Sequence, residues 1–153
     1  MTLKGEKMEE YIGAIKEFFE HRPRFNVVLI KSNREINEEG LSKELDYEAI
    51  NIQKLIAEER LKFEKIDGYT DLLEFLKCIS NGIKKEGALI NLDLLLSCLN
   101  REKRKYFFES VLQKSFPKPV VLITSIFMDE VPDVSHQEFN YAKVIEWNGS
   151  HEI

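Results

Sequence analysis

The sequence predicts a three-layer α/β/α sandwich built on a mainly parallel five-stranded sheet. Five short runs are rich in Val, Ile and Leu, and helical patterns of apolar residues separate most of them. Strands that are buried on both faces appear as continuous apolar runs, and helical crossovers join parallel strands. No internal repeat or Gly/Ser/Pro-rich linker interrupts the pattern, so we expect one domain over residues 1–153, with a core from about residue 7 to 148.

The order of the predicted elements follows from periodicity and from helix-ending residues. A first helix carries apolar residues at three- and four-residue steps from Met8 to Phe19 and ends before Pro23. A later helix has Thr70 as its predicted N-cap and is closed near Gly82 and Gly87. The five strands are predicted at residues 25–32, 47–52, 88–96, 118–128 and 141–147. The helices between them are predicted at residues 40–45, 53–63, 69–85 and 101–116.

The charge balance argues against nonspecific nucleic-acid binding. Lys and Arg number 22 against 27 Asp and Glu, which gives a net charge of −5 and no overall positive field. No segment has the long uncharged apolar run that a membrane span needs. We therefore expect a cytoplasmic protein that does not enter a membrane.

Cysteine and histidine do not form a metal-binding pattern in the sequence. Cys78 and Cys98 lie in apolar segments without His or Cys neighbours, so they predict neither a zinc site nor a disulfide framework. The interpretation favoured for both thiols is a small buried side chain. The three histidines are dispersed along the chain, and no metal centre is expected.

Residues 26–45 have the outline of a phosphate-binding loop, in which an apolar run is followed by a polar turn and a helix. Against the Walker A pattern G-x-x-x-x-G-K-[ST], the segment keeps only Gly40 and Ser42. Glu35 replaces the first glycine and Leu41 replaces the lysine, whose charge neutralises the phosphates. Lys31 and Lys43 lie nearby as substitutes for the lysine, but Lys31 ends a strand and Lys43 lies one helix turn too late. The loop is therefore interpreted as degenerate.

Polar residues at the predicted strand ends extend this comparison. Asp93 is the one acidic residue in an apolar run and lies where a magnesium-binding carboxylate would be expected. The alternative is a structural cap for a neighbouring amide, and the sequence leaves both open. Thr124 ends the fourth strand, so Ser32, Asp93 and Thr124 are expected on one rim of the sheet. Leu94 follows Asp93 where a catalytic glutamate would stand.

Several segments, taken in order, carry a family resemblance. They are "AINIQKLIAEERLKF", "GALINLDLLLSCLN", "PVVLITSIF" and "FNYAKVIEW". Over about residues 25–147 the chain resembles the BrxF-like small P-loop proteins of BREX phage-defence systems. The resemblance implies an AAA-like nucleotide-binding domain that is encoded beside a larger ATPase, a methyltransferase and a phosphatase-like protein. It also implies work in an assembly that marks host DNA and blocks phage.

The resemblance assigns roles position by position. It places Gly40 and Ser42 at the last glycine and the magnesium-binding hydroxyl of the loop, Asp93 at the acid of the third strand, and Thr124 at a sensing position. Leu41 falls at the lysine, so these contacts are expected to be vestigial and no cofactor is expected. The alternative cofactor is ATP with Mg²⁺.

Three functions follow, of which the first is the leading hypothesis. It is a non-catalytic or weakly nucleotide-binding module that contacts protein subunits of a defence complex, such as a larger ATPase. The second is an ATP-binding or ATP-hydrolysing subunit completed by a partner or a second protomer. The third is a nucleic-acid-binding accessory. Self-association and DNA contact stay open. The candidate interaction residues are an acidic group, Glu35, Glu38 and Glu39, and a basic group, Arg101, Lys103, Arg104 and Lys105.

Overall fold

The computed structural model describes residues 3–58, 66–134 and 141–147. It confirms the predicted three-layer α/β/α fold, and every strand pair in the described chain is parallel. In chain order the elements are α1 (Leu3–Glu20), β1 (Val27–Ser32), α2 (Glu38–Leu45), β2 (Glu48–Asn51), α3 (Ile52–Ala57), α4 (Tyr69–Asn81), β3 (Gly87–Ile90), α5 (Asp93–Leu96), α6 (Arg101–Val111), β4 (Val120–Thr124), the 3-10 turn η2 (Met128–Glu130) and β5 (Lys143–Trp147).

The strands lie in the order β2-β3-β4-β1-β5. The first strand therefore lies between the two that come last in the chain. In the register, Val27 is opposite Val120 of β4, and Val28 is opposite Lys143 of β5. All the residues of β1 are buried except Lys31, which is half-buried.

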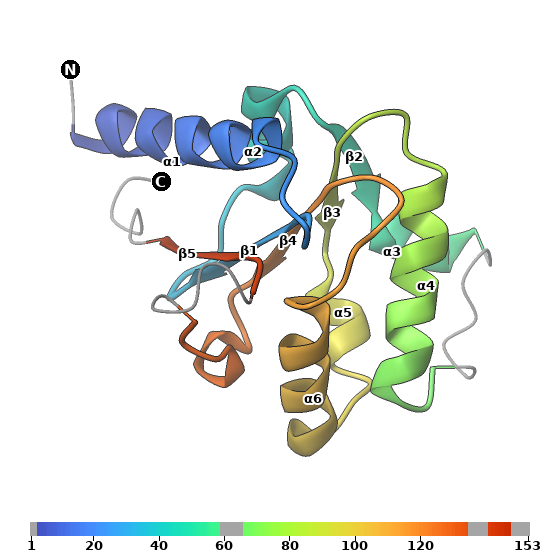
Figure 1. The fold of residues 1–153 in the computed structure, drawn as a ribbon. Helices are drawn as coiled ribbons and strands as arrows, with labels where there is room; N and C mark the ends of the chain where they lie inside the picture. Colours follow the sequence, from blue (N-terminus) through green and yellow to red (C-terminus); the bar gives the residue numbers. More distant parts are fainter. Residues whose placement is uncertain (1–2, 59–65, 135–140, 148–153) are drawn as a thin grey trace.

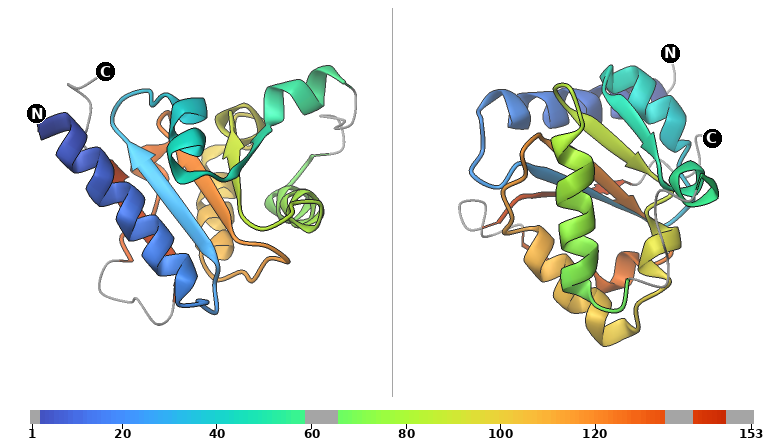
Figure 2. Two further views of the ribbon diagram at one scale, coloured as in Figure 1. Left: turned by 90° about the horizontal axis from the view of Figure 1, so that it is seen from above. Right: turned by 90° about the vertical axis from the view of Figure 1, so that its right-hand side faces the viewer.

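Two hydrophobic clusters cover the two faces of the sheet. On one face, Ile15 of α1 and Leu41 of α2 pack against Val28 and Ile30 of β1. The other face is larger and is covered by α3, α4, α5 and α6, with Phe107 among the fully buried residues. Figure 1 shows α1 and α2 above the sheet and α5 and α6 below it, with α4 at the side. In the left view of Figure 2, α1 runs alongside β1.

The third strand is shorter than the sequence predicted. It ends at Ile90, Asn91 follows in the left-handed conformation at φ 66°, and Asp93 begins α5. Asn tolerates that conformation better than most residues, so it can turn the chain at this point. The apolar residues beyond it are buried at helical spacing, at Leu92, Leu95, Leu96 and Leu99. A short apolar run does not distinguish strand from helix by itself, which explains the error.

The start of α4 also differs from the prediction. Gly68, not Thr70, is the N-cap, and Thr70 lies inside the helix. The carboxylate of Asp71 accepts hydrogen bonds from the backbone N–H groups of Asp67 at 3.1 Å and Gly68 at 3.2 Å. The acid in the first turn therefore performs the capping that the sequence assigned to the threonine. The helix ends at Asn81, before Gly82, which is the first of the two predicted ends and four residues short of the predicted limit at residue 85.

The remaining corrections concern the second predicted helix and the cysteines. Residues 59–63 of the helix predicted at 53–63 lie outside the described residues, and α3 covers Ile52–Ala57. Cys78 and Cys98 are both exposed, so the expectation of buried thiols is wrong. On α4 the buried face consists of Leu72, Leu73, Leu76 and Ser80, and Cys78 falls outside it. No helix within the described ranges is long and apolar enough to cross a membrane.

Candidate functional site

The carboxyl edge of the sheet contains a point where neighbouring connections diverge. The connection after β1 crosses the sheet face that α1 covers, because α2 packs there. The connection after β4 crosses the opposite face, where Val131 and Val134 pack. Because β1 and β4 are adjacent, their carboxyl ends form the switch point at which open α/β sheets bind ligands.

The loop at residues 33–37, between β1 and α2, lacks the features of a phosphate-binding loop. It contains no glycine, and none of its residues has a positive φ. A backbone nest for anions needs N–H groups that converge through such a conformation. Instead, Ser32 Oγ donates to the carbonyl of Arg34 at 2.6 Å, and Ile36 is buried in the core. The loop is closed on itself and against the sheet.

The structure places Gly40 and Ser42 inside helix α2, away from the loop. The helix begins at Glu38, and the side chain of Asn37 caps it by accepting from Gly40 N at 3.1 Å. Ser42 is 2% exposed, and its Oγ donates to the carbonyl of Glu39 at 2.8 Å. Gly40 and Ser42 therefore lie within the first five residues of α2, and their assignment to nucleotide contacts stays a prediction.

Glu38 occupies the start of α2, where an anion would meet the helix N-terminus. Its Oε1 accepts a hydrogen bond from the backbone N–H of Asn91 at 3.0 Å, which joins α2 to the end of β3. Burial raises the pKa of Glu38 to about 7, and the negative charges of Asp93 and Glu35 add to the rise, while the Asn91 hydrogen bond opposes it. The protein's own carboxylate thus lies at the switch point.

Asn91 extends this contact toward the edge of the sheet. Its side-chain Nδ2 donates to Asn51 Oδ1 at 3.1 Å. The same Asn51 oxygen accepts from Lys54 N at 3.3 Å and so caps α3. The sequence reasoning missed both asparagines. The available signal was a polar amide at the end of each strand, Asn51 as the last residue of β2 and Asn91 directly after β3, where a change of chain direction is expected.

Asp93 and Thr124 are brought together, as the predicted rim requires. Thr124 Oγ1 donates to Asp93 Oδ1 at 2.6 Å. The other carboxylate oxygen accepts from Ser125 N at 3.1 Å and from Ile126 N at 3.2 Å. Both oxygens therefore hold the loop after β4, which is the capping arrangement that the sequence had left as one alternative. In the described chain, no group of three or more His, Cys, Asp or Glu can hold a metal ion.

The acidic group and the basic group are not uniform surfaces. Glu35 and Glu39 are exposed, but Glu38 is partly buried and bonded to Asn91. On α6, Arg104 forms a two-point ion pair with Glu130 at 2.6 and 3.0 Å.

The Arg104 guanidinium also lies 4.1 Å from the ring centroid of Phe127 and bonds the carbonyl of Leu99. Its side chain is only 14% exposed, and Lys103 Nζ donates to the Asp67 carbonyl at 2.8 Å. The expectation of four surface cations is therefore corrected, because Arg104 faces inward. Arg101 and Lys105 remain exposed on α6.

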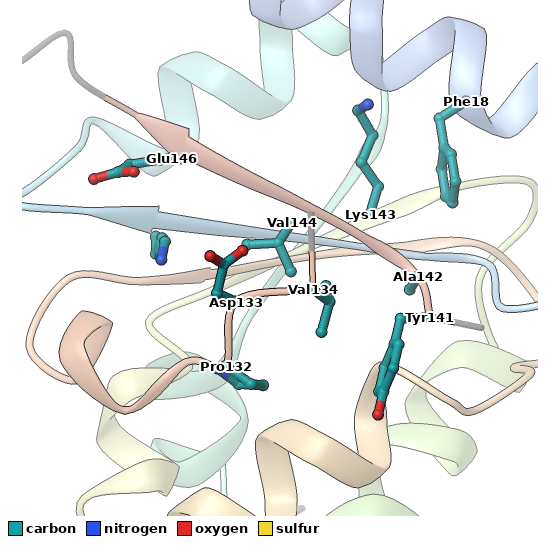
Figure 3. Close-up of a pocket in the computed structure, with 10 residues that line it drawn as sticks. Phe18, Pro132, Asp133, Val134, Tyr141, Ala142, Lys143, Val144 and Glu146 are labelled. Carbon is teal, nitrogen blue, oxygen red and sulfur yellow. The ribbon is translucent and has the colours of Figure 1, made fainter. Parts of the chain in front are cut away.

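A cavity of about 440 Å³ lies beside β5, and sequence reasoning did not predict it. Figure 3 shows Pro132, Val134 and Tyr141 on one side of β5, and Phe18 and the Lys143 side chain on the other. Charged residues also line the cavity, including Lys31 of β1 and Glu146 of β5. A lysine at the end of an otherwise apolar strand was the available signal.

Comparisons with protein-family models, curated proteins and solved structures find no match to this chain. The candidate site is therefore described by its own geometry. At the switch point the structure brings together Glu38, Asn91, Asp93 and Thr124, and it leaves Gly40 and Ser42 in the body of α2.

Proposed function

We propose that this domain is a degenerate P-loop-like module that has no nucleotide catalysis and acts as a protein-interaction subunit of a BREX-type phage-defence assembly. The proposal is based mainly on Glu38, the first residue of α2, which lies beside the switch point. Its carboxylate accepts a hydrogen bond from the backbone N–H of Asn91. A helix N-terminus and its free N–H groups attract anions. Here a carboxyl group of the same chain lies at the start of the helix, and its hydrogen bond comes from Asn91 N.

The residues present do not fit ATP with Mg²⁺. A triphosphate needs a cation to neutralise charge and backbone N–H groups that converge on it. The loop offers Glu35 and Glu38 where that cation is needed, and it has no positive-φ residue to form a nest. Asp93, the expected magnesium ligand, has both oxygens engaged by the loop after β4.

Titration calorimetry with ATP and Mg²⁺ tests the nucleotide half of the proposal. We expect no saturable binding in the submillimolar range, because the bound phosphates would lie close to two carboxylates. The control is ATP without Mg²⁺, for which we expect the same result. A micromolar isotherm would overturn this part and favour the subunit that a partner or second protomer completes.

The proposed role in protein interaction requires an exposed surface that does not depend on nucleotide catalysis. Glu35 and Glu39 are exposed next to the switch point, and complementary charge raises encounter rates and suppresses wrong partners. The double reversal Glu35→Lys/Glu39→Lys leaves Glu38 and its hydrogen bond untouched. Each such surface change is usually worth less than about 0.5 kcal/mol in stability. The fold should therefore persist while the interaction surface changes sign.

The test measures co-purification with the subunits encoded beside this chain, together with phage protection in a plaque assay. We expect Glu35→Lys/Glu39→Lys to lose both. The matched control is Glu9→Lys/Glu10→Lys, which makes the same charge change on exposed positions of α1 and should keep both. Unchanged co-purification and protection in the first variant would contradict the placement of the interface.

The nucleic-acid alternative is weakened by the geometry of α6. Arg104 is committed to Glu130, and exposed Arg101 and Lys105 are two cations on a chain of net charge −5. If the alternative held, the wild type would be retained on DNA with a steep salt dependence, and Arg101→Gln/Lys105→Gln would lose that retention. We expect neither behaviour in a salt-graded DNA retention assay.

A further inference from the structure

The cavity beside β5 is lined by a half-buried lysine that has no partner among the described residues. Lys31 is the only charged residue of β1, and its side chain lies on the sheet face that carries Val27 and Leu29. Among the described residues, its ammonium makes no hydrogen bond or ion pair. Taking an ammonium partly out of water without a partner costs free energy. A ligand anion that binds Lys31 would offset that cost.

A carboxylate lies next to this ammonium without neutralising it. Glu146 is directly opposite Lys31 in the register of β1 and β5, so their Cα atoms are about 4.8 Å apart and their side chains leave the same face. No ion pair joins the two side chains in the described structure. Asp133 adds a second carboxylate to the lining. Figure 3 shows Glu146 and Asp133 near one end of the cavity.

The rest of the lining is mainly apolar or aromatic. Val134, Tyr141 and Val144 border the cavity on the same side of β5 as Asp133 (Figure 3). The volume of about 440 Å³ falls within the roughly 300–1,000 Å³ of small-molecule sites, which combine apolar walls with a few polar groups. Shape and lining therefore favour a small ligand with an apolar part.

We propose that this cavity binds a free α-amino acid with an apolar side chain. The ligand carboxylate pairs with Lys31, the ligand ammonium pairs with Glu146 and faces Asp133, and the side chain packs against Val134 and Tyr141. A simple anion would face two carboxylates, and a simple amine would face Lys31. An α-amino acid carries both charges on groups bonded to the same carbon, so two side chains that leave adjacent strands can reach both of them. The proposal is independent of the function proposed above, because Glu38 and Asn91 do not line this cavity.

The direct test is an NMR titration of the full chain with L-leucine and L-phenylalanine. We expect saturable chemical-shift changes at Tyr141 and Val144 with at least one of the two. The matched half-ligands are 4-methylpentanoate, which is leucine without its ammonium, and 3-methylbutylamine, which is leucine without its carboxylate. Each should bind at least about tenfold more weakly than leucine, as loss of one charged contact implies. No saturable shift for either amino acid, or equal binding of a half-ligand, would overturn the proposal.

Substitutions distinguish a specific binding site for the amino acid from nonspecific electrostatic attraction. Lys31→Met keeps the length of the side chain and removes the ammonium, and Glu146→Gln removes the negative charge at an exposed position. Each should weaken amino-acid binding by at least about tenfold, while Lys31→Arg should restore most of it. The control, Lys105→Met on α6, should leave the affinity unchanged. If Lys31→Met does not fold, Glu146→Gln decides the question, and unchanged affinity in that variant refutes the assignment.

Discussion

Two carboxylates begin helices at the same edge of the sheet, and the protein satisfies them differently. Asp93 starts α5 and accepts three hydrogen bonds, from Thr124 Oγ1, Ser125 N and Ile126 N. Glu38 starts α2 and accepts one, from Asn91 N, and burial raises its pKa to about 7. The comparison indicates that the number of donors, more than the position at a helix start, decides whether a partly buried carboxylate stabilises the fold.

The largest expected effect comes from removing the well-satisfied carboxylate. Asp93→Ala removes the acceptor of three hydrogen bonds, and the buried Thr124 hydroxyl then loses the carboxylate to which it donates. We therefore expect a loss of about 2 kcal/mol in the free energy of unfolding. Urea denaturation measures it. Asp93→Asn is the matched control and should lose about half as much, because it keeps one carbonyl acceptor.

A metal role for Asp93 makes a different prediction in the same experiment. Because both oxygens already hold the loop after β4, adding Mg²⁺ should leave the midpoint of the wild-type urea transition unchanged. A midpoint that rises with Mg²⁺ in the wild type and not in Asp93→Asn would show that the carboxylate binds the ion. In that case Asp93 would be a metal ligand and could not be compared with Glu38 as a purely structural carboxylate.

Removing the charge of Glu38 is expected to increase the free energy of unfolding, whereas removing the Asp93 carboxylate decreases it. Its pKa in the folded state, about 7, lies above the ordinary value of 4.5, so its contribution to stability is fully present below about pH 4.5 and is lost as the pH rises through 7. Glu38→Gln keeps an acceptor for Asn91 N without the charge. At pH 8 we expect the variant to be more stable than the wild type by about 1 kcal/mol, a figure reduced because solvent screens this partly exposed group.

Denaturation at two pH values isolates this effect. At pH 5 the wild-type carboxyl is mostly protonated, so the advantage of Glu38→Gln should largely disappear. Glu39→Gln is the matched control, because Glu39 is the next residue of α2 and is exposed; it should change stability little at either pH. A Glu38→Gln variant that is less stable than the wild type at pH 8 would contradict the argument.

The smallest effect concerns the residue that links the two halves of this edge. Asn91 has a φ of 66°, donates its backbone N–H to Glu38, and donates its side chain to Asn51. Asn91→Gly relieves the backbone strain but loses the side-chain bond, so the two changes should nearly cancel, within about 0.5 kcal/mol. Asn91→Ala keeps the strain and should cost about 1 kcal/mol more than glycine in thermal denaturation. Equal stabilities of the two variants would show that the conformation does not matter.

The sequence predicted the layers and the strands because burial leaves a periodic signal. Val27 to Ile30 are buried on both faces and appear as an apolar run, and the same holds for Val120 to Ile123. The helix predicted at residues 69–85 is present and begins at Tyr69, but it ends at Asn81, before Gly82. These features depend on local pattern, which one chain displays directly.

The site was harder to predict because its contacts join residues that are distant in the chain. The bond from Asn91 N to Glu38 requires the relative placement of β3 and α2, and the ion pair of Arg104 with Glu130 turns one member of a basic run inward. The helix predicted at residues 40–45 begins two residues earlier, at Glu38, because the side chain of Asn37 caps it. Sequence spacing alone does not show at which residue a helix begins.

The central position of β1 has a consequence for how the chain acquires its structure. β1 is synthesised before every other strand, yet its partners are β4 and β5, the last two strands to leave the ribosome. Pairing over such long sequence separations slows folding, because the loop-closure entropy is lost before the contacts form. Until Lys143–Trp147 has been made, the apolar run from Val27 to Ile30 lacks one of its two neighbours, and so the nascent domain exposes an unpaired strand edge, which promotes aggregation.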